Sequence, residues 1–413
     1  MGQARLMNQD MAASAPGELE ELLASLIAIE SHSEVPEQEM RLAVYIQQWF
    51  QDQGIECQLQ EAIPGRPNVL ARLVGSGGGQ SLLLNGHLDT VPPYGMKGPF
   101  KAIRIGDRLY GRGSVDMKGA LAAMMMTLAS IHRSGVSMAG DVFFAGTIGE
   151  ETYSPGAYHL ARSGFRADYA VVGEPTGMRV GIAHKGVAWF EADFAGRSVH
   201  GSVPEQGVNA IYRASRWINY IQDHYLPKLK LRNHPLLGSP SLNIGMIQGG
   251  TRPVIVPNYC AIGFERRLLP GETAELALAE LELTLAAVRE EHPDFDGGIR
   301  IADNFHGVPH GPMGTSADSL LVKAMLEAYQ TEFAAEDTPV NVEPIGLQFW
   351  TDGALLQEIC PEIIVCGPGN IEQAHSDEEY IELGQLHSAY RMYVHSALAL
   401  SGQAALGAEE ERL

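Results

Sequence analysis

The sequence has no long apolar run and few cysteines. No stretch of about 18 consecutive apolar residues occurs in its 413 residues, which excludes a membrane-spanning helix. Its cysteines form no C-x-x-C pair, which argues against a disulfide framework and a thiolate zinc site. The N-terminal region holds no apolar segment of signal-peptide length. These absences predict a reduced, cytoplasmic location for the protein.

Positive charge is also scarce. The chain has 29 Lys and Arg against 50 Asp and Glu, a formal net charge of −21. Such a chain is repelled by nucleic acid and by anionic membrane surfaces, because both carry negative charge. The expected partners are therefore small molecules, metal cations or other proteins, with no nucleic acid and no membrane among them.

The chain is long enough for roughly two to three domains. Short apolar runs typical of buried strands alternate with helical segments in its first and last parts, which indicates an α/β domain with a mainly parallel sheet. The middle part shows the order βαββαβ, which is typical of a ferredoxin-like α+β unit. We expect an α/β domain at 17–186 and 305–402, an inserted domain at 187–304, and flexible tails at 1–16 and 403–413.

Several predicted strands run into side chains that can bind metal. Open α/β sheets bind ligands at the carboxyl ends of their strands, so these groups are expected to meet at one edge. Two imidazoles and several carboxylates, without a thiolate, suit a divalent ion such as zinc. An acid shared by two ions would make a centre that activates water and polarises a carbonyl. The groups are His87 and Asp89 after the strand at 81–85, Asp116 on a glycine-rich loop, Glu150 and Glu151 after 141–147, Glu174 after 168–172 and His375 after 362–366.

Each of these residues alone is more often a surface or capping group. The metal site is predicted because five chain segments supply such groups to the same edge of the expected sheet. A non-catalytic binding protein on the same scaffold would be expected to lack at least one of the six proposed ligands and acids. All six are present, namely His87, Asp116, Glu150, Glu151, Glu174 and His375.

The motifs around these residues resemble the dinuclear zinc amidohydrolases and metallopeptidases. That family includes acetylornithine deacetylase, succinyl-diaminopimelate desuccinylase, aminoacylase and glutamate carboxypeptidase. The similarity covers nearly the whole chain, and AHKG at 183–186 and GPGNIEQAH at 367–375 are most similar to acetylornithine deacetylase. The matching segments, in the family's order, are GHLDTVP at 86–92, LYGRGSVDMKGA at 109–120, GEE at 149–151, GEPT at 173–176 and AHSDEEYI at 374–381.

The resemblance implies a zinc-peptidase-like catalytic domain with a mixed, mostly parallel sheet, and a ferredoxin-like lid through which two copies dimerise. It implies two divalent metal ions, Zn²⁺ or otherwise Co²⁺ or Mn²⁺. One ion would be held by His87 and Glu174 and the other by Glu151 and His375, with Asp116 as the bridging ligand.

The resemblance also implies catalytic roles near these ligands. Glu150 would act as general base and acid, and Asp89 would orient the imidazole of His87. The peptide bond between Asp116 and Met117 is expected to be cis.

In the lid, the resemblance implies that His200 reaches toward the oxyanion from the partner subunit. Arg267 would hold the carboxylate of the substrate, and Arg266 is the competing candidate. Strand alternation places the two side chains on opposite faces, so only one of them can point at the site. Two positions depart from the family pattern: Gly149 stands where Asp is usual, and Val254 stands where many members have Asn.

The implied reaction is hydrolysis of the amide bond of an N-acyl amino acid, of the acetylornithine deacetylase type found in arginine biosynthesis. The alternative is a carboxypeptidase or dipeptidase of the glutamate carboxypeptidase type. In that case the C-terminal carboxylate of a peptide would meet Arg267.

Overall fold

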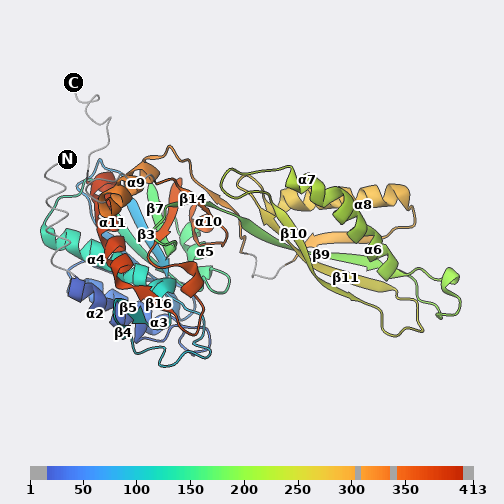
Figure 1. Ribbon diagram of the computed structural model, residues 1–413, viewed down its shortest axis with the longest axis horizontal. Helices are drawn as coiled ribbons and strands as arrows, with labels where there is room; N and C mark the ends of the chain where they lie inside the picture. The colour runs from blue at the N-terminus through green and yellow to red at the C-terminus, as the bar shows by residue number, and fades with distance from the viewer. Residues whose placement is uncertain (1–15, 303–307, 335–341, 403–413) are drawn as a thin grey trace, which may run out of the picture. The chain divides into compact units, whose positions relative to one another are not determined.

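A computed structural model describes residues 16–302, 308–334 and 342–402, which fold into two compact units (Figure 1). The first unit runs to Ile182 and includes Gly314–Ile345 and the chain from Thr351, while the second comprises Ala183–Met313 and Gly346–Trp350. The limits of the inserted segment lie four and nine residues outside the predicted 187–304, and the return of Gly346–Trp350 to the second unit was not predicted. The predicted tails, apart from residue 16, lie outside the described residues.

A nine-stranded mixed sheet forms the centre of the first unit. Its order is β1-β2-β6-β3-β7-β15-β8-β13, with β14 paired to β8. The central pairs β6–β3, β3–β7 and β7–β15 are parallel, and the pairs β1–β2, β2–β6 and β15–β8 are antiparallel, which confirms the predicted mixed sheet. The strands are β1 (Glu56–Ile63), β2 (Arg66–Leu73), β3 (Leu82–His87), β6 (Val142–Thr147), β7 (Tyr169–Pro175), β8 (Gly181–His184), β13 (Met313–Gly314), β14 (Ile345–Leu347) and β15 (Glu362–Gly367).

Helices cover both faces of the central strands. Figure 1 shows α4 and α11 on one side of β3 and β7, and α5 and α10 on the other. This explains why β3 and β7 are buried at every residue and read as continuous apolar runs. The helices are α2 (Pro16–Ile27), α3 (Met40–Asp52), α4 (Gly119–Ser134), α5 (Pro155–Arg162), α9 (Leu320–Phe333), α10 (Gly353–Leu356) and α11 (Leu383–Ser401).

A small sheet with the order β16-β5-β4 accompanies the large one. It joins residues that are far apart in the sequence, since β16 pairs with β5 in antiparallel fashion. No helix in the described part of the chain is long and apolar enough to cross a membrane. The short elements here are β4 (Ile103–Ile105), β5 (Arg108–Tyr110), β16 (Tyr380–Glu382) and the turns η1 (Ser114–Lys118) and η4 (Ile371–Gln373).

The second unit has the predicted order βαββαβ. Its antiparallel sheet, β10-β11-β9-β12, packs one face on α6 and α8 around the buried rings of Phe190, Phe194, Trp217 and Phe264. Asn209 caps the start of α6 with its side chain. The elements are β9 (Gly186–Ala195), η2 (Pro204–Gln206), α6 (Ala210–Tyr220), η3 (Ile221–Tyr225), α7 (Leu226–Lys230), β10 (Ser241–Gly249), β11 (Tyr259–Leu268), α8 (Ala274–Glu291) and β12 (Gly297–Ile301).

Candidate metal centre

Four adjacent parallel strands of the first unit deliver the proposed ligands to one edge of the sheet. His87 is the last residue of β3, and Glu174 lies at the end of β7. Glu150 and Glu151 follow β6, and His375 follows β15. Because the carboxyl ends of parallel strands lie at the same edge, segments far apart in the sequence converge there.

Asp116, in the turn before α4, lies between the two imidazoles. Its Oδ1 is 3.0 Å from Nε2 of His87, and its Oδ2 is 3.2 Å from Nε2 of His375. His87 Nε2 is also 3.6 Å from Glu174 Oε1, and His375 Nε2 is 3.0 Å from Glu151 Oε1. The structure thus brings together the two expected pairs, each beside one oxygen of Asp116.

The charges in this cluster suit a bridging carboxylate. Burial acts to raise the pKa of Asp116, but hydrogen bonds with His375 and His87 hold that pKa well below its ordinary value. Hydrogen bonds with Asp116 and Glu151 raise the pKa of His375 to about 10. The backbone of His375 is left-handed, with a φ of 58°, and the Asp116–Met117 peptide bond is cis, as the resemblance implies.

The residues at this edge fit divalent cations. Glu174 is buried, and its Oε1 has no hydrogen-bond partner in the described part of the chain. Burial and the charge of Glu174 raise the pKa of Glu150 well above its ordinary value, and burial does the same for Glu174. A bound cation would offset the repulsion between these carboxylates and would be a ligand partner for the free oxygen of Glu174. Imidazole and carboxylate donors suit divalent ions such as zinc.

Asp89 contacts His87 through a different atom from the one expected. His87 Nδ1 lies 2.9 Å from the backbone oxygen of Asp89 and 3.6 Å from its carboxylate. The carboxylate instead accepts hydrogen bonds from the backbone N–H groups of Gly149, Glu150 and Glu151 at 2.9, 3.1 and 3.0 Å. The backbone oxygen of Asp89 is thus the nearer partner of the imidazole, and its side chain also holds the turn of the paired acids.

Two glycines permit this packing. A Cβ on Gly86 would lie 2.6 Å from Cε of Met117 and 2.9 Å from Cδ2 of Leu121, so the ends of these two side chains would have to move. Gly149 has a φ of 75°, a left-handed conformation that glycine adopts without steric cost. A Cβ on Gly149 would lie 2.7 Å from Cδ of Pro155, so the Asp usual in the family would require a shift at this turn, and the departure from the family pattern suits the local packing.

The proposed lid residues lie in the second unit. His200 is exposed, and its Nδ1 is 2.7 Å from Oγ of Ser202. Arg266 is fully buried and its Nη2 lies 3.0 Å from Glu272 Oε1, which commits it to the interior. Arg267 is 35% exposed and pairs with Glu265 at 3.3 Å, so it is the arginine that a ligand can reach. The roles of His200 and Arg267 stay predictions.

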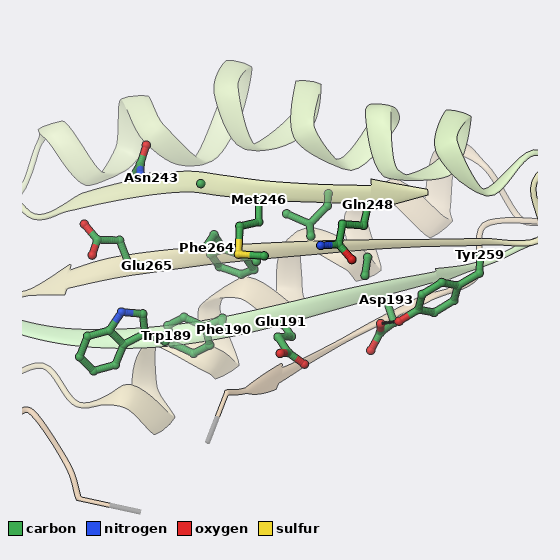
Figure 2. A pocket seen from close by; sticks show the side chains of 14 residues that line it. Trp189, Phe190, Glu191, Asp193, Asn243, Met246, Gln248, Tyr259, Phe264 and Glu265 are labelled. Carbon is green, nitrogen blue, oxygen red and sulfur yellow. Dashed lines mark hydrogen bonds between the residues drawn. The ribbon is translucent and has the colours of Figure 1, made fainter. Parts of the chain in front are cut away.

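The open face of the sheet in the second unit carries a groove (Figure 2). Trp189, Met246, Tyr259 and Glu265 are among its lining side chains, and Figure 2 shows Glu265 and Asn243 near one end of it. None of the proposed metal ligands lines this groove.

One buried acid at this end of the sheet was not predicted. Asp352, at the start of α10, accepts a hydrogen bond from Oγ1 of Thr147 at 2.8 Å, and burial raises its pKa to about 6. Thr147 ends β6, three residues before Glu150. Asp352 lies five residues after β14, a three-residue strand that was not predicted from the sequence, so the pattern that identified the other acids gave no signal for it.

Comparisons with known proteins agree with this geometry. The family described as peptidase family M20/M25/M40 matches residues 83–399. Acetylornithine deacetylase of Aliivibrio salmonicida is 32% identical over 340 residues, which cover 81% of this chain and 84% of that protein. The enzyme of the same name from Photorhabdus laumondii is 30% identical over 383 residues, covering 88% and 92%.

Solved structures share the fold. An aminopeptidase from Bacillus cereus has a TM-score of 0.77 at 20% identity and covers 93% of this chain and 98% of its own. A dinuclear metal-binding peptidase of the M20 family from Bacillus subtilis has a TM-score of 0.71 at 16% identity, with 94% and 98% covered. With the match of the family over most of the chain, these findings show that the chain belongs to peptidase family M20/M25/M40 and is a metal-dependent hydrolase of amide bonds.

Proposed function

We propose that the protein removes a small acyl group from an N-acyl amino acid, with N-acetylornithine as the leading substrate. The observation that carries the proposal is the position of Asp116 between His87 and His375, with a further carboxylate beside each imidazole. The acetylornithine deacetylases that align over more than four-fifths of the chain support the choice of substrate. Such a reaction would place the protein in arginine biosynthesis, in the cytoplasm.

Two divalent ions, Zn²⁺ or otherwise Co²⁺ or Mn²⁺, are the proposed cofactors. His87 and Glu174 would hold one ion, Glu151 and His375 the other, and Asp116 both. Bound there, the ions supply an activated water and polarise the carbonyl of the amide. The unpartnered Oε1 of Glu174 and the mixed imidazole and carboxylate donors support this assignment.

Glu150 is the proposed general base and acid. It takes a proton from the attacking water and returns it to the leaving nitrogen. Burial and the charge of Glu174 raise the pKa of Glu150 above its ordinary value, which is the direction that favours a carboxyl able to accept and return a proton. Asp89 supports this role, because its carboxylate fixes the backbone on which Glu150 stands.

The second unit supplies the proposed contacts with substrate. His200 of the partner subunit would donate a hydrogen bond to the oxyanion in a homodimer formed through the lid, and Arg267 would bind the carboxylate of the amino acid. The exposure of His200 and the exposure of Arg267 beside buried Arg266 support these assignments.

A substrate panel tests the proposal. Protein loaded with Zn²⁺ or Co²⁺ is assayed on N-acetylated amino acids, N-acetylornithine included, and on dipeptides. We expect the highest kcat/KM on an N-acetyl amino acid and no turnover after removal of metal with a chelator. Preference for dipeptides would replace the deacylase by the peptidase alternative, and full activity in metal-free protein would overturn both.

A further inference from the structure

A second buried carboxylate holds the turn that carries Asp116. The side chain of Glu379 is 1% exposed. Its Oε1 accepts hydrogen bonds from the backbone N–H groups of Val115 and Asp116 at 3.0 and 3.2 Å. Its Oε2 accepts one from the N–H of Gly113 at 3.0 Å and one from Nη1 of Arg112 at 2.6 Å. Four donors from one short segment thus converge on a single carboxylate.

These bonds fix Asp116 from its backbone side. The N–H of Asp116 is directed to Glu379, while its two carboxylate oxygens lie beside His87 and His375. A rotation of this turn would therefore break the bonds to Glu379 and carry the carboxylate away from one of the imidazoles.

Glu379 also belongs to the segment that carries His375. It follows that histidine by four residues, and its backbone oxygen accepts a hydrogen bond from the N–H of Gly111 at 3.2 Å. The next residue, Tyr380, pairs with Tyr110 between β16 and β5. Glu379 therefore joins the two segments that bring Asp116 and His375, which are more than 250 positions apart in the sequence.

The charge of Glu379 is matched within this contact. Arg112, also 1% exposed, pairs with Glu379, so this buried ion pair adds no net charge beside the proposed ligands. Glu379 is absent from the groups of side chains in the described residues that could hold a metal ion. Its hydrogen bonds are with backbone groups and with Arg112, so its carboxylate is not one of the proposed metal ligands.

We propose that Glu379 is a positioning residue of the metal centre. It sets the separation of Asp116 and His375 by holding the turn at 113–116 against the segment of His375. This inference rests on the proposed metal site, and it is independent of which acyl amino acid is the substrate.

The test is the metal affinity of Glu379→Gln. An amide side chain has one acceptor oxygen, and its NH₂ group would face backbone donors, so two of the four hydrogen bonds are lost. Loss of a group that orients metal ligands weakens metal binding by about 10–100-fold. Titration of metal-free protein with Co²⁺, followed by calorimetry, is expected to show this loss, together with a fall in kcat larger than any change in KM.

Asp168→Asn is the matched control. Asp168 accepts hydrogen bonds from the backbone N–H and Oγ of Ser81 at 2.7 and 2.8 Å, at the amino ends of β3 and β7. The substitution thus makes the same change from carboxylate to amide at the opposite end of the same strands. We expect a lower unfolding temperature and wild-type affinity for Co²⁺.

Wild-type Co²⁺ affinity in folded Glu379→Gln would overturn the proposal, as would an equal loss of affinity in the control. If Glu379→Gln does not fold, Glu379→Asp, which keeps the charge but shortens the side chain, is titrated instead. We expect weakened affinity there, and unchanged affinity would overturn the proposal. Wild-type protein that binds Co²⁺ but hydrolyses no acyl amino acid would refute the proposed function and leave this titration readable.

Discussion

The two units hold their proposed functional residues in different ways. In the first unit, Asp116 lies within 3.2 Å of both His87 and His375. His87 ends β3 and Asp116 lies in a buried turn, whereas His375 is half exposed and contacts both Asp116 and Glu151. In the second unit, His200 is exposed and bonded to a neighbour two residues away, and Arg267 pairs with Glu265 on the same strand.

The difference concerns what completes each site. The proposed metal ligands form a cluster with contacts inside one unit, so their arrangement is a property of that unit's fold. In the described residues, the side chains of His200 and Arg267 form hydrogen bonds only with residues two positions away, so their proposed roles require a substrate or a partner subunit. Variants of the first unit are therefore expected to change metal binding or chemistry, and those of the second to change recognition.

The largest expected effect is that of Glu150→Gln. Removal of the general base should lower kcat by about 10²–10⁴-fold, because proton transfer contributes a rate factor of that size. Metal content, measured by atomic absorption, should stay close to that of the wild type. The neighbouring variant Glu151→Gln is the control, since loss of a proposed ligand should lower metal content. Substantial activity in Glu150→Gln would remove its assigned role.

His200→Ala should lower kcat by about 10²-fold, as loss of an oxyanion donor does in other hydrolases. If this histidine acts on the site of the partner, mixing His200→Ala with Glu150→Gln should restore part of the activity. Each mixed dimer then contains one site with a wild-type Glu150 and a wild-type partner histidine. Activity is measured after subunit exchange, and no recovery in verified mixed dimers would place the action of His200 within its own chain or remove it.

Arg267→Ala is expected to act mainly on KM. Loss of a charge-assisted hydrogen bond to the substrate carboxylate costs about 1.5–3 kcal/mol, which corresponds to roughly 10–100-fold in KM. Steady-state kinetics on the best N-acetyl amino acid measure this change. Arg300→Ala is the control, because Arg300 pairs with Glu191 and Asp193 on the same sheet and should leave KM unchanged. An equal KM in both variants would reject the role of Arg267.

The sequence predicted that the proposed metal ligands would lie together because most of them follow buried strands. His87, Glu151 and Glu174 each stand at or just after an apolar run, so their convergence follows from the parallel order of the strands. The order of elements in the second unit was also readable, since Phe190 and Phe194 alternate with polar residues along β9.

Other features depend on contacts that no local pattern records. Glu379 and Arg112 stand inside motifs quoted for other reasons, but their pairing joins segments 267 positions apart. The carboxylate of Asp89 lies 3.6 Å from the imidazole of His87, but it also accepts hydrogen bonds from three backbone N–H groups of the turn that follows β6, which no local pattern indicated. The antiparallel strand β1 was not predicted, because its residues are exposed or half-buried and so form no continuous apolar run.

The smallest expected effect is a difference between the two units in how the free energy of unfolding changes as the pH falls. Burial lowers the pKa of His184 to about 4; this histidine ends β8, whose last two residues are the first two of the second unit. The unfolded chain binds this proton near pH 6.5, so between these values the free energy of unfolding falls as the pH falls. By pH 5.5 the loss is about 1 kcal/mol. In the first unit burial raises the pKa of Glu150 and Glu174, so their protonation acts in the opposite direction in metal-free protein.

His184→Asn isolates this contribution, because an asparagine amide can still donate to the Lys185 carbonyl that lies 3.1 Å from Nδ1 of His184. Urea unfolding of the metal-free wild type and variant is compared at pH 8 and pH 5.5. The wild type should lose about 1 kcal/mol more than the variant, since the other titrating groups are common to both. An equal pH dependence would mean that His184 binds its proton in the folded unit, and the contrast in acid response between the two units would then disappear.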